Sequence, residues 1–195
     1  MTKKKSALVW SAALLVLISA LVFYNLPAAP SPAGADSAKV LDSSSQFSSD
    51  APLGHQPGEQ LADFSMIQTN GQTFTLSQYR GKVVVLNLWA TWCTPCVKEL
   101  PHFDRLQQAY PDEVKVLAIH SDLVTDDPLA YLKDFDYHIA FAVDENSQII
   151  SSLGGSTMLP QTLVLSPRGE VTYNRVGSVS YEALEELVHA AQTQE

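Results

Sequence analysis

Two cysteines stand three residues apart where a buried strand gives way to a helix. The strand is the run Lys82–Leu88 (KVVVLNL), whose aliphatic residues are typical of a strand buried on both faces. The segment WATWCTPCVKELP follows it, and Pro95 suits the first turn of a helix because it has no N–H to donate. Cys93 and Cys96 are the only cysteines in the chain. Two thiolates do not complete a structural zinc site. The pair is therefore better explained by the reactivity of its thiols than by a structural role in the fold.

The expected helix gives the two thiols different roles. Free backbone N–H groups and the helix dipole favour an anion at a helix N-terminus, so Cys93 is expected to form the thiolate and act as the nucleophile. Cys96 lies one turn further on, where it can attack a mixed disulfide formed on Cys93. Two other interpretations stay open: an inert buried pair, and a copper or zinc site. For a metal site, His102 is the histidine nearest in sequence.

The chain divides into three zones. An uncharged stretch rich in Leu, Val, Ala and Ile follows Lys3–Lys5, and it is long enough to cross a bilayer. Residues 1–26 are therefore predicted to be a membrane anchor or signal segment whose N-terminal end is cytoplasmic. An A-x-A pattern at Ala33–Ala35 leaves cleavage open. Residues 27–58, rich in Pro, Ala and Ser, are predicted to be a linker, and residues 59–195 a folded domain.

Hydrophobic patterns in the third zone predict an α/β domain with a mixed sheet. Asn70-Gly71 marks a leading β-hairpin, and Ser166–Gly169 marks a later one. The predicted strands are Leu61–Ile67, Gln72–Phe74, Lys82–Leu88, Lys115–His120, Ile139–Val143, Thr162–Leu165 and Glu170–Val176. The predicted helices are Thr94–Ala109, Asp126–Phe135, Ser147–Leu153 and Tyr181–Ala191.

Charge excludes one class of partner. The formal net charge is −9, and three of the 12 basic residues stand together at Lys3–Lys5, ahead of the domain. Binding to nucleic acid needs clustered Lys and Arg to neutralise phosphates. We therefore expect no nucleic acid partner.

The segment around the cysteines resembles the thioredoxin superfamily, and within it the membrane-anchored TlpA/ResA-like thiol–disulfide oxidoreductases. The family pattern is W-x-x-W-C-x-x-C followed by x-x-E-x-P, and it is matched here by Trp89, Trp92, Cys93, Cys96, Glu99 and Pro101. A second motif, Leu159-Pro160-Gln161-Thr162, resembles the segment that holds the family's cis-proline. The resemblance covers about Leu61–Leu187. It implies a thioredoxin fold, with a mixed central sheet flanked by helices and an extra N-terminal β-hairpin.

The resemblance also implies a redox-active enzyme, a thiol–disulfide oxidoreductase that needs no cofactor and no metal. Cys93 and Cys96 would be catalytic, as nucleophilic and resolving thiols. The residues expected to bind substrate are Trp92, Thr94, Pro95, Leu159 and Pro160. A reductase of protein disulfides is the favoured direction. A disulfide-donating oxidant of the same fold, or a copper-binding assembly module, are the alternatives.

The expected electron donor follows from the resemblance, and the expected location follows from the basic and apolar pattern of residues 1–26. Substrates would be protein disulfides, such as those of apocytochrome c during cytochrome c maturation, of a copper-site protein or of another disulfide enzyme. A membrane thiol carrier would supply electrons. The chain would be a single-pass protein of the bacterial inner membrane, held by residues 1–26, with its domain in the periplasm. A cleaved, soluble periplasmic form is the alternative.

Two departures from the family concern proton transfer. Thioredoxin has a buried aspartate that assists its second cysteine, and Asn87 stands at that position here. ResA-like proteins have a glutamate between the cysteines, where this chain has Thr94. Glu99 is the nearest acid in sequence, and two interpretations of it stay open: a proton-handling residue or a solvated helix residue.

Overall fold

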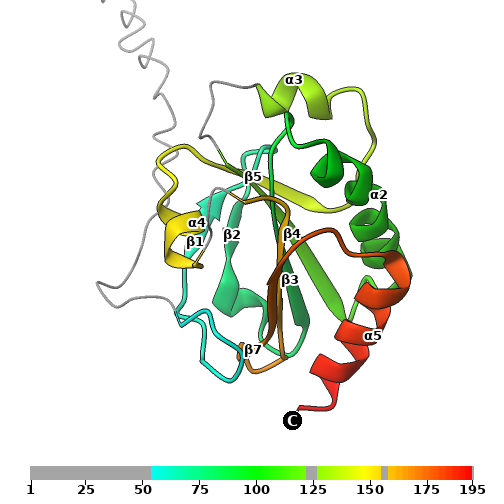
Figure 1. Ribbon diagram of the computed structural model, residues 1–195. Coiled ribbons are helices and arrows are strands. Elements are labelled where there is room, and N and C mark those ends of the chain that lie inside the picture. Colours follow the sequence, from blue (N-terminus) through cyan, green and yellow to red (C-terminus); the bar gives the residue numbers. More distant parts are fainter. Residues whose placement is uncertain (1–53, 122–126, 155–157, 195) are drawn as a thin grey trace, which may run out of the picture. The chain divides into compact units, whose positions relative to one another are not determined.

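A five-stranded sheet with the strand order β5-β4-β3-β6-β7 forms the centre of the domain (Figure 1). The computed structural model describes residues 54–121, 127–154 and 158–194, so the predicted anchor and nearly all of the predicted linker lie outside the described residues. The strands are β1 (Ser65–Ile67), β2 (Thr73–Thr75), β3 (Val83–Trp89), β4 (Val114–Ser121), β5 (Ala140–Asp144), β6 (Gln161–Leu165) and β7 (Val171–Val176). The helices are η1 (Leu76–Tyr79), α2 (Thr94–Ala109), α3 (Pro128–Leu132), α4 (Gln148–Ser152) and α5 (Tyr181–Gln192). None of the helices in the described residues is long and apolar enough to cross a membrane.

The sheet is mixed, as the sequence predicts. β3 pairs in parallel with β4, and β4 in parallel with β5, whereas β6 runs antiparallel to both β3 and β7. The predicted leading hairpin forms a separate two-stranded antiparallel sheet from β1 and β2. Its turn follows Asn70, whose side chain accepts a hydrogen bond from the Gln72 N–H at 2.9 Å. This is the local bonding that makes Asn a turn residue.

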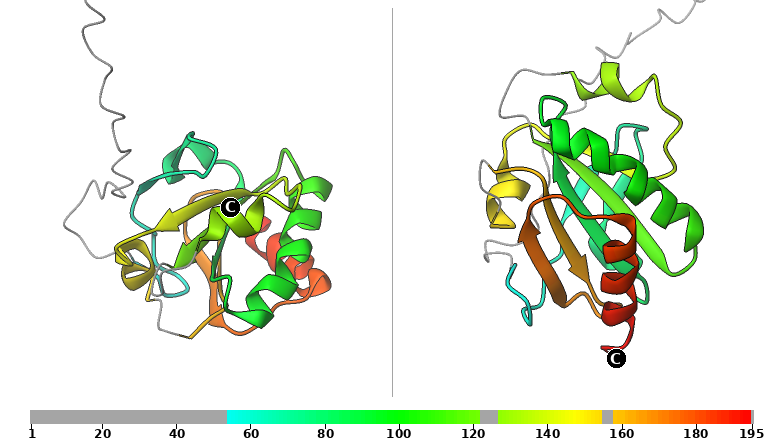
Figure 2. Two further views of the ribbon diagram at one scale, coloured as in Figure 1. Left: turned by 90° about the horizontal axis from the view of Figure 1, so that it is seen from above. Right: turned by 45° about the vertical axis from the view of Figure 1, so that its right-hand side comes forward.

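Two hydrophobic layers cover the two faces of the sheet. α2 and α5 cover one face, whereas α4 and the β1–β2 hairpin lie on the other (Figure 2). Alternate residues of β3 serve the two layers: Val83 and Val85 pack under α2 and α5, and Val84 and Leu86 pack toward the hairpin. All seven residues of β3 are buried, which explains why this strand shows no polar alternation in the sequence.

Segments from the N-terminal side of the domain cover parts of both edges of the sheet. At the β5 edge, Gln68 forms an isolated bridge with Ala142, and the Thr69 N–H donates to the Phe141 carbonyl at 2.8 Å. At the β7 edge, Val171 exchanges hydrogen bonds with Gly58 and Glu59 of the incoming chain at 2.9 and 2.8 Å. Backbone groups that would otherwise face solvent are satisfied there.

Asp144 ends β5 and holds the start of α4. Its buried carboxylate accepts hydrogen bonds from the backbone N–H groups of Gln148 and Ile150, at 3.1 and 2.8 Å. Asp144→Ala should lower the free energy of unfolding by about 2 kcal/mol, because the buried Ile150 N–H and the part-buried Gln148 N–H would lose their acceptor. Asp127→Ala is the matched control, since Asp127 caps α3 through one exposed hydrogen bond to the Ala130 N–H and should cost about 1 kcal/mol or less. Urea unfolding measures both, and equal losses would contradict the ranking.

Candidate active site

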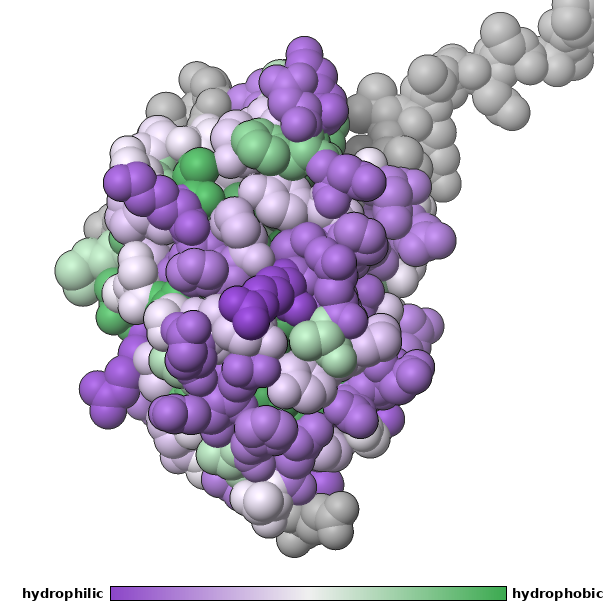
Figure 3. Space-filling view, turned by 90° about the vertical axis from the view of Figure 1, so that its right-hand side faces the viewer, coloured by the Kyte–Doolittle hydropathy of each residue, from purple (hydrophilic) through white to green (hydrophobic). Residues whose placement is uncertain are grey.

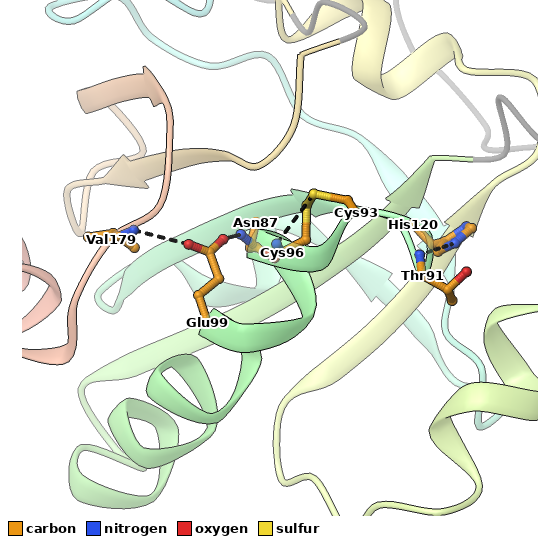
Figure 4. Close-up of a disulfide and its surroundings, with 7 residues drawn as sticks. All are labelled: Asn87, Thr91, Cys93, Cys96, Glu99, His120 and Val179. Atoms are coloured by element: carbon orange, nitrogen blue, oxygen red, sulfur yellow. Dashed lines mark hydrogen bonds between the residues drawn. A yellow bond between two sulfur atoms is a disulfide. The ribbon is translucent and has the colours of Figure 1, made fainter.

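Cys93 and Cys96 form a disulfide at the N-terminus of α2 (Figure 4). Cys93 is the residue that caps the helix, and its Sγ accepts a hydrogen bond from the Cys96 N–H at 3.3 Å. The Cys93 N–H bonds the Ala90 carbonyl at 3.1 Å, which closes the turn between β3 and α2. Pro95 lies in the first turn, as predicted. The backbone therefore points a donor at the sulfur of Cys93.

The two sulfurs differ in access. Cys93 has 5% of its surface exposed and Cys96 has none. The next residues of α2, Thr94 and Pro95, are exposed. A disulfide in another protein can therefore approach this end of α2 from the side of Cys93, while Cys96 stays inside.

Glu99 lies one turn after Cys96 on the buried face of α2. Only 2% of it is exposed, so the solvated-residue interpretation is wrong. Its Oε1 accepts a hydrogen bond from Asn87 Nδ2 at 2.8 Å, and its Oε2 accepts one from the Val179 N–H at 3.0 Å (Figure 4). Burial raises the pKa of Glu99 to about 7, against the two hydrogen bonds, which lower it. The carboxyl therefore changes its protonation state near neutral pH.

His120 touches the loop that leads into the cysteines. Its ring is buried in β4 and packs edge-on against Trp89, with ring centroids 5.0 Å apart. Its Nε2 accepts a hydrogen bond from the Thr91 N–H at 3.4 Å. His120 is not among the residues that the sequence predicts for the site. The signal in the sequence that could have found it is its position at the end of the predicted buried strand Lys115–His120.

The predicted substrate-binding residues come from two segments that the sheet brings together. Leu88 and Gln161 are register partners, so Leu159 and Pro160 lie beside the end of β3 from which the cysteines follow. The Leu159–Pro160 peptide is cis, as the resemblance implies. Leu159 packs against the layer that contains both cysteines.

Trp92 is 48% exposed and offers an apolar surface next to Cys93. Met158, just before Leu159, is also exposed. Hydrophilic residues, by contrast, cover most of the side of the molecule over α2 and α5 (Figure 3). Trp92 and Met158 are thus exposed apolar side chains on the two segments that carry Cys93 and the cis Pro160.

The metal interpretation finds no support in the described part of the chain. Within residues 54–121, 127–154 and 158–194, no group of three or more His, Cys, Asp or Glu side chains is arranged to hold a metal ion. The Nδ1 of His102 lies 3.1 Å from the Val179 carbonyl oxygen, within hydrogen-bond distance. His102 therefore faces the segment before α5.

Comparisons with known proteins agree with this geometry. The model of the AhpC/TSA family matches residues 57–174. Thioredoxin-like protein YneN of Bacillus subtilis is 29% identical over 69% of this chain and 79% of its own length. The thiol-disulfide oxidoreductase ResA of Bacillus thuringiensis is 30% identical over 67% of this chain and 76% of its own. The crystal structure of a putative thiol:disulfide interchange protein DsbE from Chlorobium tepidum superposes with a TM-score of 0.64 at 28% identity, over 71% of this chain and 99% of that one.

Proposed function

Because this chain belongs to the AhpC/TSA family and is a thiol–disulfide oxidoreductase of the ResA/DsbE type, we propose that it reduces disulfides of other proteins. The observation that carries the proposal is the disulfide at the start of α2, in which Cys93 keeps a small exposed area and Cys96 is fully buried. An attacking thiol has to reach its substrate, whereas a resolving thiol has only to reach its neighbour. The geometry therefore supports Cys93 as nucleophile and Cys96 as resolving thiol.

The reaction begins from the reduced pair. The Cys93 thiolate attacks a disulfide of the substrate, forms a mixed disulfide and releases one substrate sulfur as a thiolate that takes up a proton. Cys96 then loses its proton and attacks the Cys93 sulfur. The bond to the substrate breaks, and the second substrate sulfur leaves and is protonated. The substrate gains two electrons and two protons, and the enzyme is left with the Cys93–Cys96 disulfide.

Glu99 is the group we assign to the Cys96 proton. It lies on the same face of α2, three residues from Cys96, and its raised pKa lets it accept a proton near neutral pH. The neighbouring carboxylate also disfavours a second negative charge on the dithiol. Reduced dithiols that are less well stabilised make stronger reductants, which supports the reductase direction.

Substrate would dock across the two segments that meet at the cysteines. Trp92, Thr94 and Pro95 would contact it from the α2 side, and Leu159 and Pro160 from the β6 side. The exposed indole of Trp92 and the exposed first turn of α2 support this assignment. Protein disulfides in extended segments fit such a surface.

The setting we propose is extracytoplasmic. The basic and apolar pattern of residues 1–26 supports a single membrane anchor with the domain on the far side of the bacterial inner membrane. A membrane thiol carrier would return two electrons to the Cys93–Cys96 disulfide after each turnover. Apocytochrome c and copper-site proteins are substrate classes to test first. In both, the cysteines must be reduced before haem or copper can bind to them.

The reduction potential tests the direction. Equilibration of the purified protein with dithiothreitol or glutathione buffers, followed by thiol alkylation and mass measurement, should give about −270 mV or lower, near the value of thioredoxin. A value near about −120 mV would make the protein a disulfide donor and reverse the proposed direction. The absence of a reversible couple would contradict the oxidoreductase chemistry itself.

A further inference from the structure

Asn87 and Thr162 face each other across two strands beneath α2. They are register partners in the β3–β6 pair, and their side chains lie on the sheet face that α2 covers, because Val85 and Val164 of the same strands pack there. Both are buried, with Thr162 1% exposed and Asn87 fully covered. Side chains directly opposite in a sheet have neighbouring Cβ atoms, so these two polar groups are adjacent.

Each member of this pair has a polar atom without a partner among the described residues. The atoms are Asn87 Oδ1 and Thr162 Oγ1. Asn87 uses its Nδ2 for Glu99, which leaves its oxygen unused. Buried polar atoms are almost always hydrogen-bonded, either to protein or to an internal water, because leaving them without a partner costs free energy.

The pair of Asn87 and Thr162 lies near the residues to which we assign the resolving step. Glu99 touches Asn87, and Cys96 lies one turn before Glu99 on the same buried face of α2 (Figure 4). The same layer contains aliphatic and aromatic side chains, among them Leu100 and Phe103 of α2. Asn87 is therefore in contact with the proposed proton acceptor, and Thr162 is the partner of Asn87 on the neighbouring strand.

We propose that Asn87 and Thr162 hold an internal water between Cys96 and Glu99, and that Thr162 is a positioning residue for the resolving step. The inference rests on the proposed roles of Cys96 and Glu99. The Cys96 thiol gives its proton to the water, and the water gives a proton to a carboxylate oxygen of Glu99, so the water is regenerated. The electron pair left on Cys96 forms the bond to the Cys93 sulfur as the bond to the substrate breaks.

The predicted effect is confined to one kinetic phase. Excess reduced protein is mixed with DTNB, a small aromatic disulfide whose thiolate is coloured. The first release of colour reports attack by Cys93 and depends on protein concentration. The second release reports attack by Cys96, and its rate does not depend on protein concentration. Thr162→Val, which keeps the shape and removes the hydroxyl, should slow the second phase about tenfold and leave the first unchanged.

Rescue and control variants separate positioning from packing. Thr162→Ser retains the hydroxyl and should restore most of the second phase. Thr162→Ala removes the hydroxyl without adding a methyl group and should be as slow as Thr162→Val, which keeps the test valid if the valine protein does not fold. Thr172→Val is the matched control in β7, where the hydroxyl donates to the Val164 carbonyl, and both phases should stay at the wild-type rate.

The outcomes distinguish this inference from the function on which it rests. A wild-type second phase in Thr162→Val, equal slowing of both phases, or no rescue by serine would each overturn the role of Thr162. If Glu99→Gln slows the second phase while Thr162→Val does not, the proton acceptor stands and only the water site is wrong. If neither variant slows it, the assignment of Glu99 falls as well.

Discussion

Replacing Cys93 with serine should abolish disulfide exchange, a loss of roughly a thousandfold or more, because the remaining thiol, that of Cys96, is fully buried. Cys96→Ser should instead retain the first attack and stop at the mixed disulfide. Incubation with a disulfide-bonded substrate protein, followed by non-reducing electrophoresis and mass spectrometry, should show an adduct through Cys93 in the second variant and none in the first.

The buried position of Cys96 makes this asymmetry a sharp test. The double variant, with both cysteines replaced by serine, is the control and should form no adduct. Adducts that form through Cys96 in the Cys93→Ser protein would show that the inner sulfur is the nucleophile. The proposed order of the two steps would then be wrong.

The oxidised protein should lose about 2 to 3 kcal/mol of unfolding free energy between about pH 5 and about pH 8 through Glu99 alone. The pKa of this carboxyl rises from 4.5 to about 7 on folding. Between these values the folded protein holds a proton that the unfolded chain has released. The contribution of Glu99 to stability is therefore fully present below about pH 4.5 and is lost as pH rises through about 7, where the buried group must ionise.

Glu99→Gln isolates this effect, because a neutral amide cannot titrate. Its stability should change less between the two pH values, and the difference between the two proteins measures the contribution of Glu99. The pKa of Asp144 is also raised by burial, but Asp144 is present in both proteins and cancels in the difference. Urea unfolding at each pH measures the curves, and parallel curves would show that Glu99 does not titrate as described.

Local sequence signals predicted most of the fold. The bounds of α2, Thr94–Ala109, are those expected, because a capping residue and Pro95 define its start. The buried strands follow from uninterrupted β-branched runs, and the first hairpin follows from Asn70-Gly71. These features depend on neighbours in sequence, so a single chain is enough to find them.

The environment of Glu99 could not be predicted in this way. The Val179 N–H that binds its carboxylate is 80 residues away in sequence, and Asn87 belongs to a different strand. Helical periodicity alone did not decide whether Glu99 faced solvent or the sheet. His120 is similar, since its bond to the Thr91 N–H depends on the pairing of β3 with β4. Contacts between distant segments decide both cases.

The covered sheet edges have a consequence for a protein that exchanges disulfides with other proteins. Chains with unmade or wrong disulfides expose extended segments, and an open strand edge is a template to which such segments add and polymerise. Here the backbone of Gln68 and Thr69 pairs with part of β5, while the backbone of Gly58 and Glu59 pairs with the start of β7. Substrate proteins therefore find fewer free backbone N–H and C=O groups at these edges. This favours a transient mixed disulfide over lasting strand addition to the sheet.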